Sequence, residues 1–101
     1  MEDINYLQDE SFEFFKKRFK HHRSKFDSST MFIHLVEEVG EIGRQVFNKE
    51  TGMRELSREN LEEELGQALI DLMVLMKLEG FEAEELVRKK LDSMKKKKYV
   101  D

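Results

Sequence analysis

The chain of 101 residues contains no cysteine and no proline, and it has only five glycines. Without cysteine it can form neither disulfide bonds nor thiolate metal sites, and its composition fits a reducing compartment. The lack of proline and the shortage of glycine remove the residues that most often interrupt helices. Because convincing β-alternation is also missing, we expect an all-α protein.

Long apolar runs are absent as well. No run approaches the roughly 20 residues that a membrane-spanning helix requires, and residues 1–20 contain no stretch typical of a secretory signal. We therefore expect a cytoplasmic protein without membrane contacts. A length of 101 residues suits one modest core, so residues 1–101 are assigned to a single domain.

The net charge of −4 is distributed unevenly along the chain. Ten acidic and four basic residues lie from Glu37 to Asp71, whereas residues 88–98 contain seven basic residues and one acid. Residues 16–25 are also basic. An acidic centre between basic segments suits a metal-dependent site for a polyanion, although lysine-rich helix ends also complement the helix dipole. Binding of nucleic acid through the basic tail is a further alternative, which the acidic pI near 5.5 disfavours.

Apolar residues at three- and four-residue steps predict four helices, over residues 4–22, 30–47, 60–79 and 82–97. The second helix has the clearest stripe: Phe32, Leu35, Val36, Val39, Ile42 and Val46.

Several residues indicate where these helices begin and end. Asp3 is a plausible N-cap, and residues 26–30 form a loop rich in capping side chains. Asn60 and Glu63 form a candidate capping pair at the start of the third helix, and Gly80 is a natural residue for its end. Residues 48–60 are expected to be a polar connector with room for a short helical turn.

The third predicted helix is apolar on nearly every side between Ala68 and Met76. A helix of this kind must be buried on all sides, and three short helices cannot surround it, so we expect a second subunit to cover one side. Gly40, Gly43 and Gly66 lie inside predicted helices, where they are expected to let neighbouring helices approach closely.

Acidic side chains line one face of each central helix, within arcs of about 100° or less at 100° per residue. These faces consist of Glu37, Glu38 and Glu41 on the second helix, and of Glu64, Gln67 and Asp71 on the third. If the two faces meet, the converging carboxylates require a cation or retained protons. Oxygen ligands of this kind suit Mg²⁺ or Mn²⁺.

Two other interpretations of these carboxylates remain open. The glutamates of the second helix could form a solvated face, as such strings commonly do. Asp71, the only charged residue from Ala68 to Met76, could be the buried partner of an arginine or a histidine.

The segments LVEEVGEIGRQVF (35–47) and LEEELGQALIDLMVLMKLEG (61–80), followed by a basic helix, resemble the MazG-like all-α nucleoside triphosphate pyrophosphatases. The resemblance covers roughly residues 30–99 and includes the EExxE part of the family pattern. It implies Mg²⁺ coordination at Glu38, Glu41 and Glu64, with Glu37 as an accessory carboxylate. The chain departs from the ExxD part, because Gln67 stands where the family has aspartate. Asp71, one turn later, could take over that ligand role.

From the residues and the resemblance together we predict a Mg²⁺-dependent pyrophosphohydrolase that cleaves nucleoside triphosphates to the monophosphate and pyrophosphate. In this hypothesis Glu38, Glu41, Glu64 and Asp71 hold the metal, and Gln67 is a neighbouring or substitute ligand. Glu37 or Glu41 would activate the attacking water. The resemblance also implies a four-helix protomer that assembles into a homodimer or homotetramer. The alternative is a catalytically degenerate helical oligomer that acts as an interaction or regulatory module, which the loss of the ExxD aspartate favours.

Phosphate binding is assigned to the basic segments on either side of the acidic centre. Lysine side chains there would clamp the phosphates of the nucleotide. The candidates are Lys17, Lys20 and Lys95.

Overall fold

The computed structural model describes residues 3–52 and 57–97, which form four α-helices and one short 3₁₀ helix. The elements are α1 (Ile4–Arg18), η1 (Phe19–His21), α2 (Ser28–Thr51), α3 (Arg58–Leu78) and α4 (Ala83–Lys96). No strand occurs in these residues, which confirms the predicted all-α class with four helices. None of the helices in the described ranges is long and apolar enough to cross a membrane.

Aspartate side chains cap the N-termini of α1 and α2. The Asp3 carboxylate accepts a hydrogen bond of 2.8 Å from the backbone N–H of Tyr6, so its predicted role as N-cap of α1 is confirmed. Asp27, in the predicted capping loop, accepts a hydrogen bond of 2.9 Å from the N–H of Thr30 and caps α2.

The start of α3 differs from the prediction. The Ser57 hydroxyl accepts a hydrogen bond of 3.2 Å from the N–H of Asn60 and caps the helix, so the predicted pair of Asn60 and Glu63 was wrong. The helix ends as expected before Gly80, whose φ of 86° is left-handed.

The predicted connector over residues 48–60 is shorter than expected, because α2 continues to Thr51. It ends at Gly52, which has a left-handed φ of 71°. Residues 53–56 of the connector lie outside the described residues.

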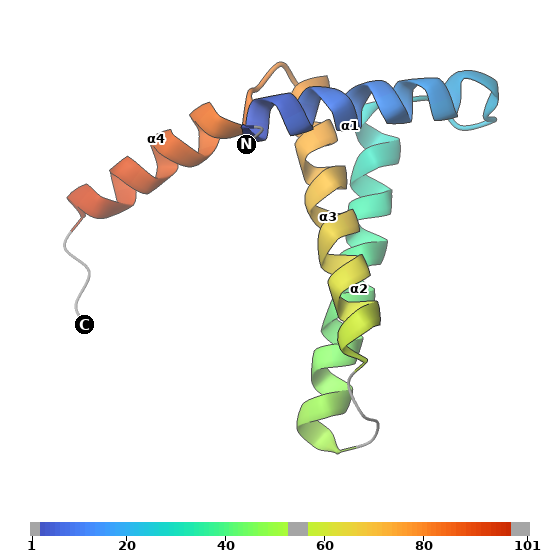
Figure 1. Ribbon diagram of the computed structural model, residues 1–101, viewed down its shortest axis with the longest axis vertical. Coiled ribbons are helices and arrows are strands. Elements are labelled where there is room, and N and C mark those ends of the chain that lie inside the picture. Colours follow the sequence, from blue (N-terminus) through green and yellow to red (C-terminus); the bar gives the residue numbers. More distant parts are fainter. Residues whose placement is uncertain (1–2, 53–56, 98–101) are drawn as a thin grey trace.

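The helices α2 and α3 lie side by side and antiparallel, and α1 crosses one end of this pair (Figure 1). The core lies under this crossing, where Phe15 and Phe19 pack with Met31 and Val74. No described residue of α3 before Asp71 is fully buried. The other end of the α2–α3 pair therefore remains accessible between its two helices.

The side chain of Gln8 ties three helices together at the crossing, and it is only 1% exposed. Its Nε2 donates hydrogen bonds of 2.9 Å to the carbonyl of Met73 and of 3.1 Å to that of Phe81. Its Oε1 accepts one of 2.9 Å from the N–H of Ala83. One buried amide thus joins α1 to the end of α3 and the start of α4.

The apolar stripe that predicts α2 is mostly exposed in one copy of the chain. Phe32, Val36 and Val39 are 55%, 52% and 54% exposed, and Val46 is also open to solvent. On α3, exposed leucines occur at the same helical spacing: Leu65, Leu69 and Leu72. The sequence pattern identified these apolar faces correctly, but the chain's own helices do not cover them.

The helical glycines are likewise exposed, so the predicted close approach of neighbouring helices does not occur within one chain. A Cβ atom built on Gly40, Gly43 or Gly66 would meet no atom within 4 Å. These positions therefore do not bring α2 or α3 against a neighbouring helix of the same chain.

Candidate active site

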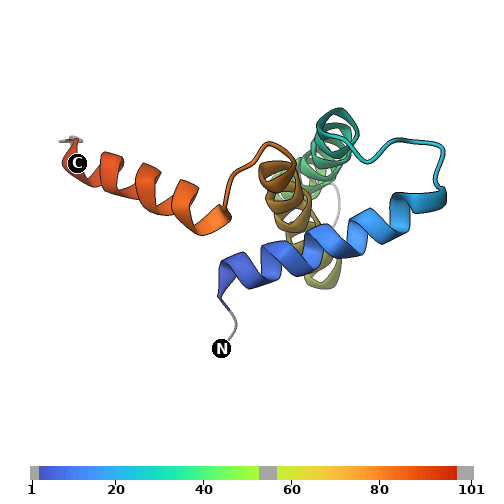
Figure 2. The same cartoon turned by 90° about the horizontal axis from the view of Figure 1, so that it is seen from above.

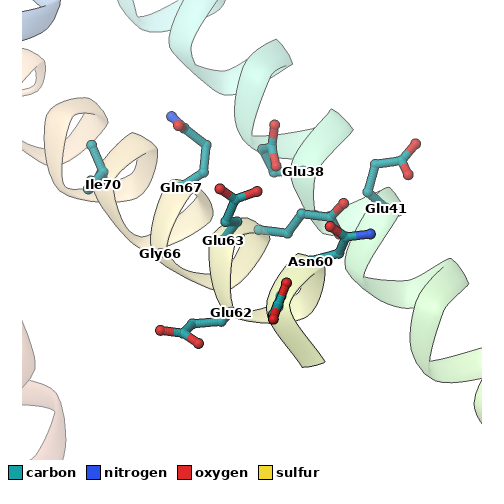
Figure 3. A pocket seen from close by; sticks show the side chains of 10 residues that line it. Glu38, Glu41, Asn60, Glu62, Glu63, Gly66, Gln67 and Ile70 are labelled. Carbon is teal, nitrogen blue, oxygen red and sulfur yellow. The ribbon is translucent and has the colours of Figure 1, made fainter. Parts of the chain in front are cut away.

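A pocket of about 890 Å³ opens between α2 and the first half of α3, a volume in the range of small-molecule sites. Its lining consists of Glu38, Glu41, Glu59, Asn60, Glu62, Glu63, Glu64, Gly66, Gln67 and Ile70. Figure 3 shows Glu38 and Glu41 on α2, across from Glu63 and Gln67 on α3. Six of the lining residues are glutamates, and within the described part of the chain none is a lysine or an arginine. The pocket is therefore strongly acidic.

Glu38, on α2, is close enough to α3 for negative charges on that helix to affect its pKa. Its pKa is raised, first because partial burial removes water from the carboxylate, and then because of the negative charges of Asp71 and Glu64 on α3. Glu41 and Glu37 of its own helix add smaller contributions in the same direction. Negative charges on α3 therefore act on a carboxylate of α2.

Two of the predicted metal ligands are hydrogen-bonded to side chains of α2. Glu64 accepts a hydrogen bond of 2.6 Å from Nε2 of Gln45, and Glu41 pairs with Arg44. The sequence reasoning missed Gln45, although it stands four residues after Glu41 and so shares its helix face. Gln45 orients the Glu64 carboxylate across the gap between the helices.

Asp71 is the most buried of the predicted metal ligands, with 1% of its surface exposed, and it lies behind Gln67 rather than among the residues that line the pocket. Its Oδ1 accepts a hydrogen bond of 2.7 Å from Nε2 of Gln67, the residue at the ExxD position. Its Oδ2 is buried and has no hydrogen-bond partner among the described residues. Burial raises the pKa of Asp71, and the Gln67 hydrogen bond and the charge of His34 offset this only in part. Asp71 forms no ion pair within residues 3–52 and 57–97, so the suggested arginine or histidine salt bridge is absent there.

The remaining predicted site residues lie around the pocket or away from it. Glu37 is exposed and does not line the pocket, although its charge reaches Glu38. Lys17, Lys20 and Lys95 are not among the lining residues of their own chain. The lining residues that the sequence reasoning did not assign to the site are Glu59, Asn60, Glu62, Glu63, Gly66 and Ile70. The run of acidic residues at 62–64 was the available signal for Glu62 and Glu63.

The donor set fits a hard divalent cation. Carboxylates and an amide supply oxygen ligands, and the unpartnered Oδ2 of Asp71 is an acceptor that a cation could satisfy. As the side chains stand, no group of three or more acidic or histidine residues in the described part is close enough to hold a metal ion. Binding one would require the carboxylates to move closer together, and the bonds to Arg44 and Gln45 each occupy only one oxygen of Glu41 and of Glu64.

We expect the substitution Asp71→Asn to raise the free energy of unfolding at neutral pH in buffer without metal. Between the unfolded-state pKa near 3.8 and the raised folded-state pKa, the folded chain binds more protons than the unfolded chain. The free energy of unfolding contributed by Asp71 therefore falls as the pH rises through this window, and asparagine removes that loss. Urea unfolding in EDTA from pH 4 to pH 7 measures it, with the exposed Asp92→Asn as control. An Asp71→Asn protein with the wild-type pH dependence would contradict this interpretation.

Fold and site together define an all-α protein with an acidic pocket between two antiparallel helices. Over residues 26–99 the chain matches the family of the MazG nucleotide pyrophosphohydrolase domain, and it belongs to this family. The match confirms the resemblance inferred from the sequence. Neither a curated protein nor a solved structure matches the chain significantly.

Proposed function

We propose that the chain is a divalent-metal-dependent nucleoside triphosphate pyrophosphohydrolase, and that the pocket between α2 and α3 is its active site. The observation that carries the proposal is the geometry of this pocket, whose lining brings Glu38 and Glu41 of α2 together with glutamates of α3 such as Glu64. In a member of the MazG family, such a convergence of carboxylates supports a cation-dependent site for a phosphate-bearing substrate.

In this proposal Glu38, Glu41, Glu64 and Asp71 hold Mg²⁺ or Mn²⁺. The bound cation would neutralise charge on the phosphate oxygens. Glu37, which stays exposed beside the site, or Glu41 would accept a proton from the attacking water. The hydrolysis breaks the link between the α- and β-phosphates, and water supplies the hydroxyl that completes the nucleoside monophosphate and pyrophosphate.

The test is pyrophosphate release from a panel of ribo- and deoxyribonucleoside triphosphates with Mg²⁺. We expect release from at least one nucleotide, its loss in EDTA, and strongly reduced release by a Glu41→Ala variant. No release from any nucleotide, or undiminished release by the variant, would contradict the proposal.

A second candidate function is that of a catalytically silent interaction module. The observation that favours it is Gln67, whose amide stands at the ExxD position and is bound to Asp71. Substitution of Gln67→Asp separates the two. A degenerate site predicts that activity appears only with aspartate, whereas our proposal predicts activity in the wild-type protein.

We further propose that two copies of the chain associate through the exposed apolar faces of α2 and α3. Rotation by 100° per residue places Phe32, Val36 and Val39 within an arc of about 60°. Leu65, Leu69 and Leu72 form an arc of the same width on α3. A contiguous apolar face of this kind on a soluble chain is typical of an interface. The centres of both arcs lie more than about 120° from Glu38, Glu41 and Gln67, so association would leave the pocket open.

Light scattering coupled to gel filtration tests the association. At micromolar concentration we expect the wild-type protein to have at least twice the chain mass of 12.1 kDa. The double substitution Val36→Glu and Leu69→Glu should give a folded monomer, because it buries two unpaired charges in the interface. Lys49→Glu changes the net charge by the same two units at an exposed polar position of α2 and should not alter the mass. A monomeric wild-type protein would contradict the proposal.

A further inference from the structure

Two glutamine side chains donate hydrogen bonds to two of the predicted metal ligands. Nε2 of Gln45, on α2, lies 2.6 Å from Oε2 of Glu64, and Nε2 of Gln67 lies 2.7 Å from Oδ1 of Asp71. Both bonds are partly buried. Because the amide nitrogen carries hydrogens and the amide oxygen carries none, a carboxylate determines which end of the amide faces it. Each amide is therefore held in one orientation.

The same two pairs contain the buried side-chain atoms that lack a hydrogen-bond partner within residues 3–52 and 57–97. These atoms are Oε1 of Gln45 and Oδ2 of Asp71. An amide oxygen and an ionised carboxylate oxygen only accept hydrogen bonds. Since buried polar atoms of native proteins have partners, atoms of this kind indicate a missing ion or water. A hydrated cation supplies what such acceptors lack, because it brings both positive charge and water hydrogens.

Each amide leaves its carboxylate with one oxygen that has no hydrogen bond. Oε2 of Glu64 is bonded to Gln45 and Oδ1 of Asp71 to Gln67, which leaves Oε1 of Glu64 and Oδ2 of Asp71 for a cation. A cation that took both oxygens of either carboxylate would compete with an amide hydrogen for one of them. Coordination through a single oxygen avoids this competition.

Divalent cations differ in the number of oxygens that they require. Ca²⁺ takes about six to eight oxygens and binds many carboxylates through both of them, whereas Mg²⁺ is smaller and demands near-octahedral geometry. Mn²⁺ also occupies octahedral oxygen sites. Carboxylates that offer one oxygen each therefore suit Mg²⁺ and Mn²⁺ better than Ca²⁺.

We propose that Gln45 and Gln67 determine which cation the site accepts. By binding one oxygen of Glu64 and one of Asp71, they restrict both carboxylates to single-oxygen coordination and favour Mg²⁺ or Mn²⁺ over Ca²⁺. The role rests on the metal site of the function proposed above. Both glutamines are positioning residues, because they act on the cation through the carboxylates. The amide at the ExxD position then has a function of its own, which is to orient Asp71.

Calorimetric titrations with Mn²⁺ alone and with Ca²⁺ alone test this selection in the absence of nucleotide. The variants Gln45→Met and Gln67→Met keep the side-chain length and a similar helix propensity, but they have no N–H to donate. We expect the wild type to bind Mn²⁺ at least about 10-fold more tightly than Ca²⁺, and each substitution to lower this ratio at least about fivefold. Simple damage to the site would weaken both cations and leave the ratio unchanged.

Two results would overturn the proposal. One is a ratio that stays within about twofold of the wild-type ratio in either variant. The other is a wild-type protein that binds Ca²⁺ as tightly as Mn²⁺, which requires no variant to observe. Ser93→Met is the control, because it introduces methionine at an exposed position of α4, away from the pocket. It should leave both dissociation constants within about twofold, and a fall of the ratio in this control would also contradict the role of the glutamines.

The measurement separates this proposal from the proposed function. If the glutamine variants lose the preference for Mn²⁺ but the wild type hydrolyses no nucleotide, the selection stands and the hydrolase function falls. If the wild type releases pyrophosphate with Mg²⁺ but neither glutamine affects the ratio, the function stands and the selection falls.

Discussion

Replacing Glu38 by glutamine is expected to reduce pyrophosphate release at least about 100-fold, the scale on which loss of one electrostatic contact to the transition state acts. Glu38 lines the pocket and is the carboxylate that responds to charges on both helices. Glutamine keeps its size but removes the charge that would attract the cation.

The same substitution should not destabilise the fold. The pKa of Glu38 is raised, so its ionised form disfavours the folded state at neutral pH, and a neutral amide relieves that cost. Loss of activity with unchanged or increased resistance to urea would therefore separate a functional role from a structural one. The exposed Glu13→Gln on α1 is the control and should keep full activity. A Glu38→Gln protein with more than a tenth of the wild-type rate would contradict its place in the site.

Replacing Gln8 by alanine is expected to lower the free energy of unfolding by about 3 kcal/mol, since each buried polar group left unpaired costs about 1–3 kcal/mol. The substitution removes hydrogen bonds to the carbonyls of Met73 and Phe81 and from the N–H of Ala83. The bonds to Met73 and from Ala83 are buried, and the bond to Phe81 is partly buried, so at least two backbone groups would lose their partner away from water.

Urea unfolding at a fixed protein concentration measures this loss, because association between chains adds to apparent stability. The exposed Glu10→Ala on the same helix should change stability by less than about 0.5 kcal/mol. A loss below about 1 kcal/mol for Gln8→Ala would contradict the role of this amide.

The sequence was sufficient for the helices and for the composition of their polar faces. Helical rotation put Glu38 and Glu64 on one acidic face each, and the structure shows that both residues line one pocket. The cap of α3 was less predictable, because Ser57 and Asn60 are both capping residues and only three positions apart. The bond between Gln67 and Asp71 joins residues four apart on one face, and helical spacing could have predicted it.

Other features depend on how the helices pack, which periodicity does not specify. An apolar stripe such as that of Phe32, Val36 and Val39 predicts a face that needs covering, but it does not say whether the same chain covers it. In the same way, Lys95 was assigned to phosphate binding from the charge of its segment. Its distance from the pocket of its own chain follows only from the direction in which α4 leaves the fold (Figure 2).

The most direct measurement is a calorimetric titration with Mn²⁺ of the wild-type protein and of the single variants Glu38→Gln and Glu64→Gln. If α2 and α3 together hold one divalent ion, the wild type should bind Mn²⁺, and each variant should weaken binding at least about 10-fold although the two changes lie on different helices. Glu10→Gln, away from the pocket, should leave binding unchanged. A wild-type protein that does not bind Mn²⁺, or binding that either pocket variant leaves intact, would contradict a metal site shared between α2 and α3.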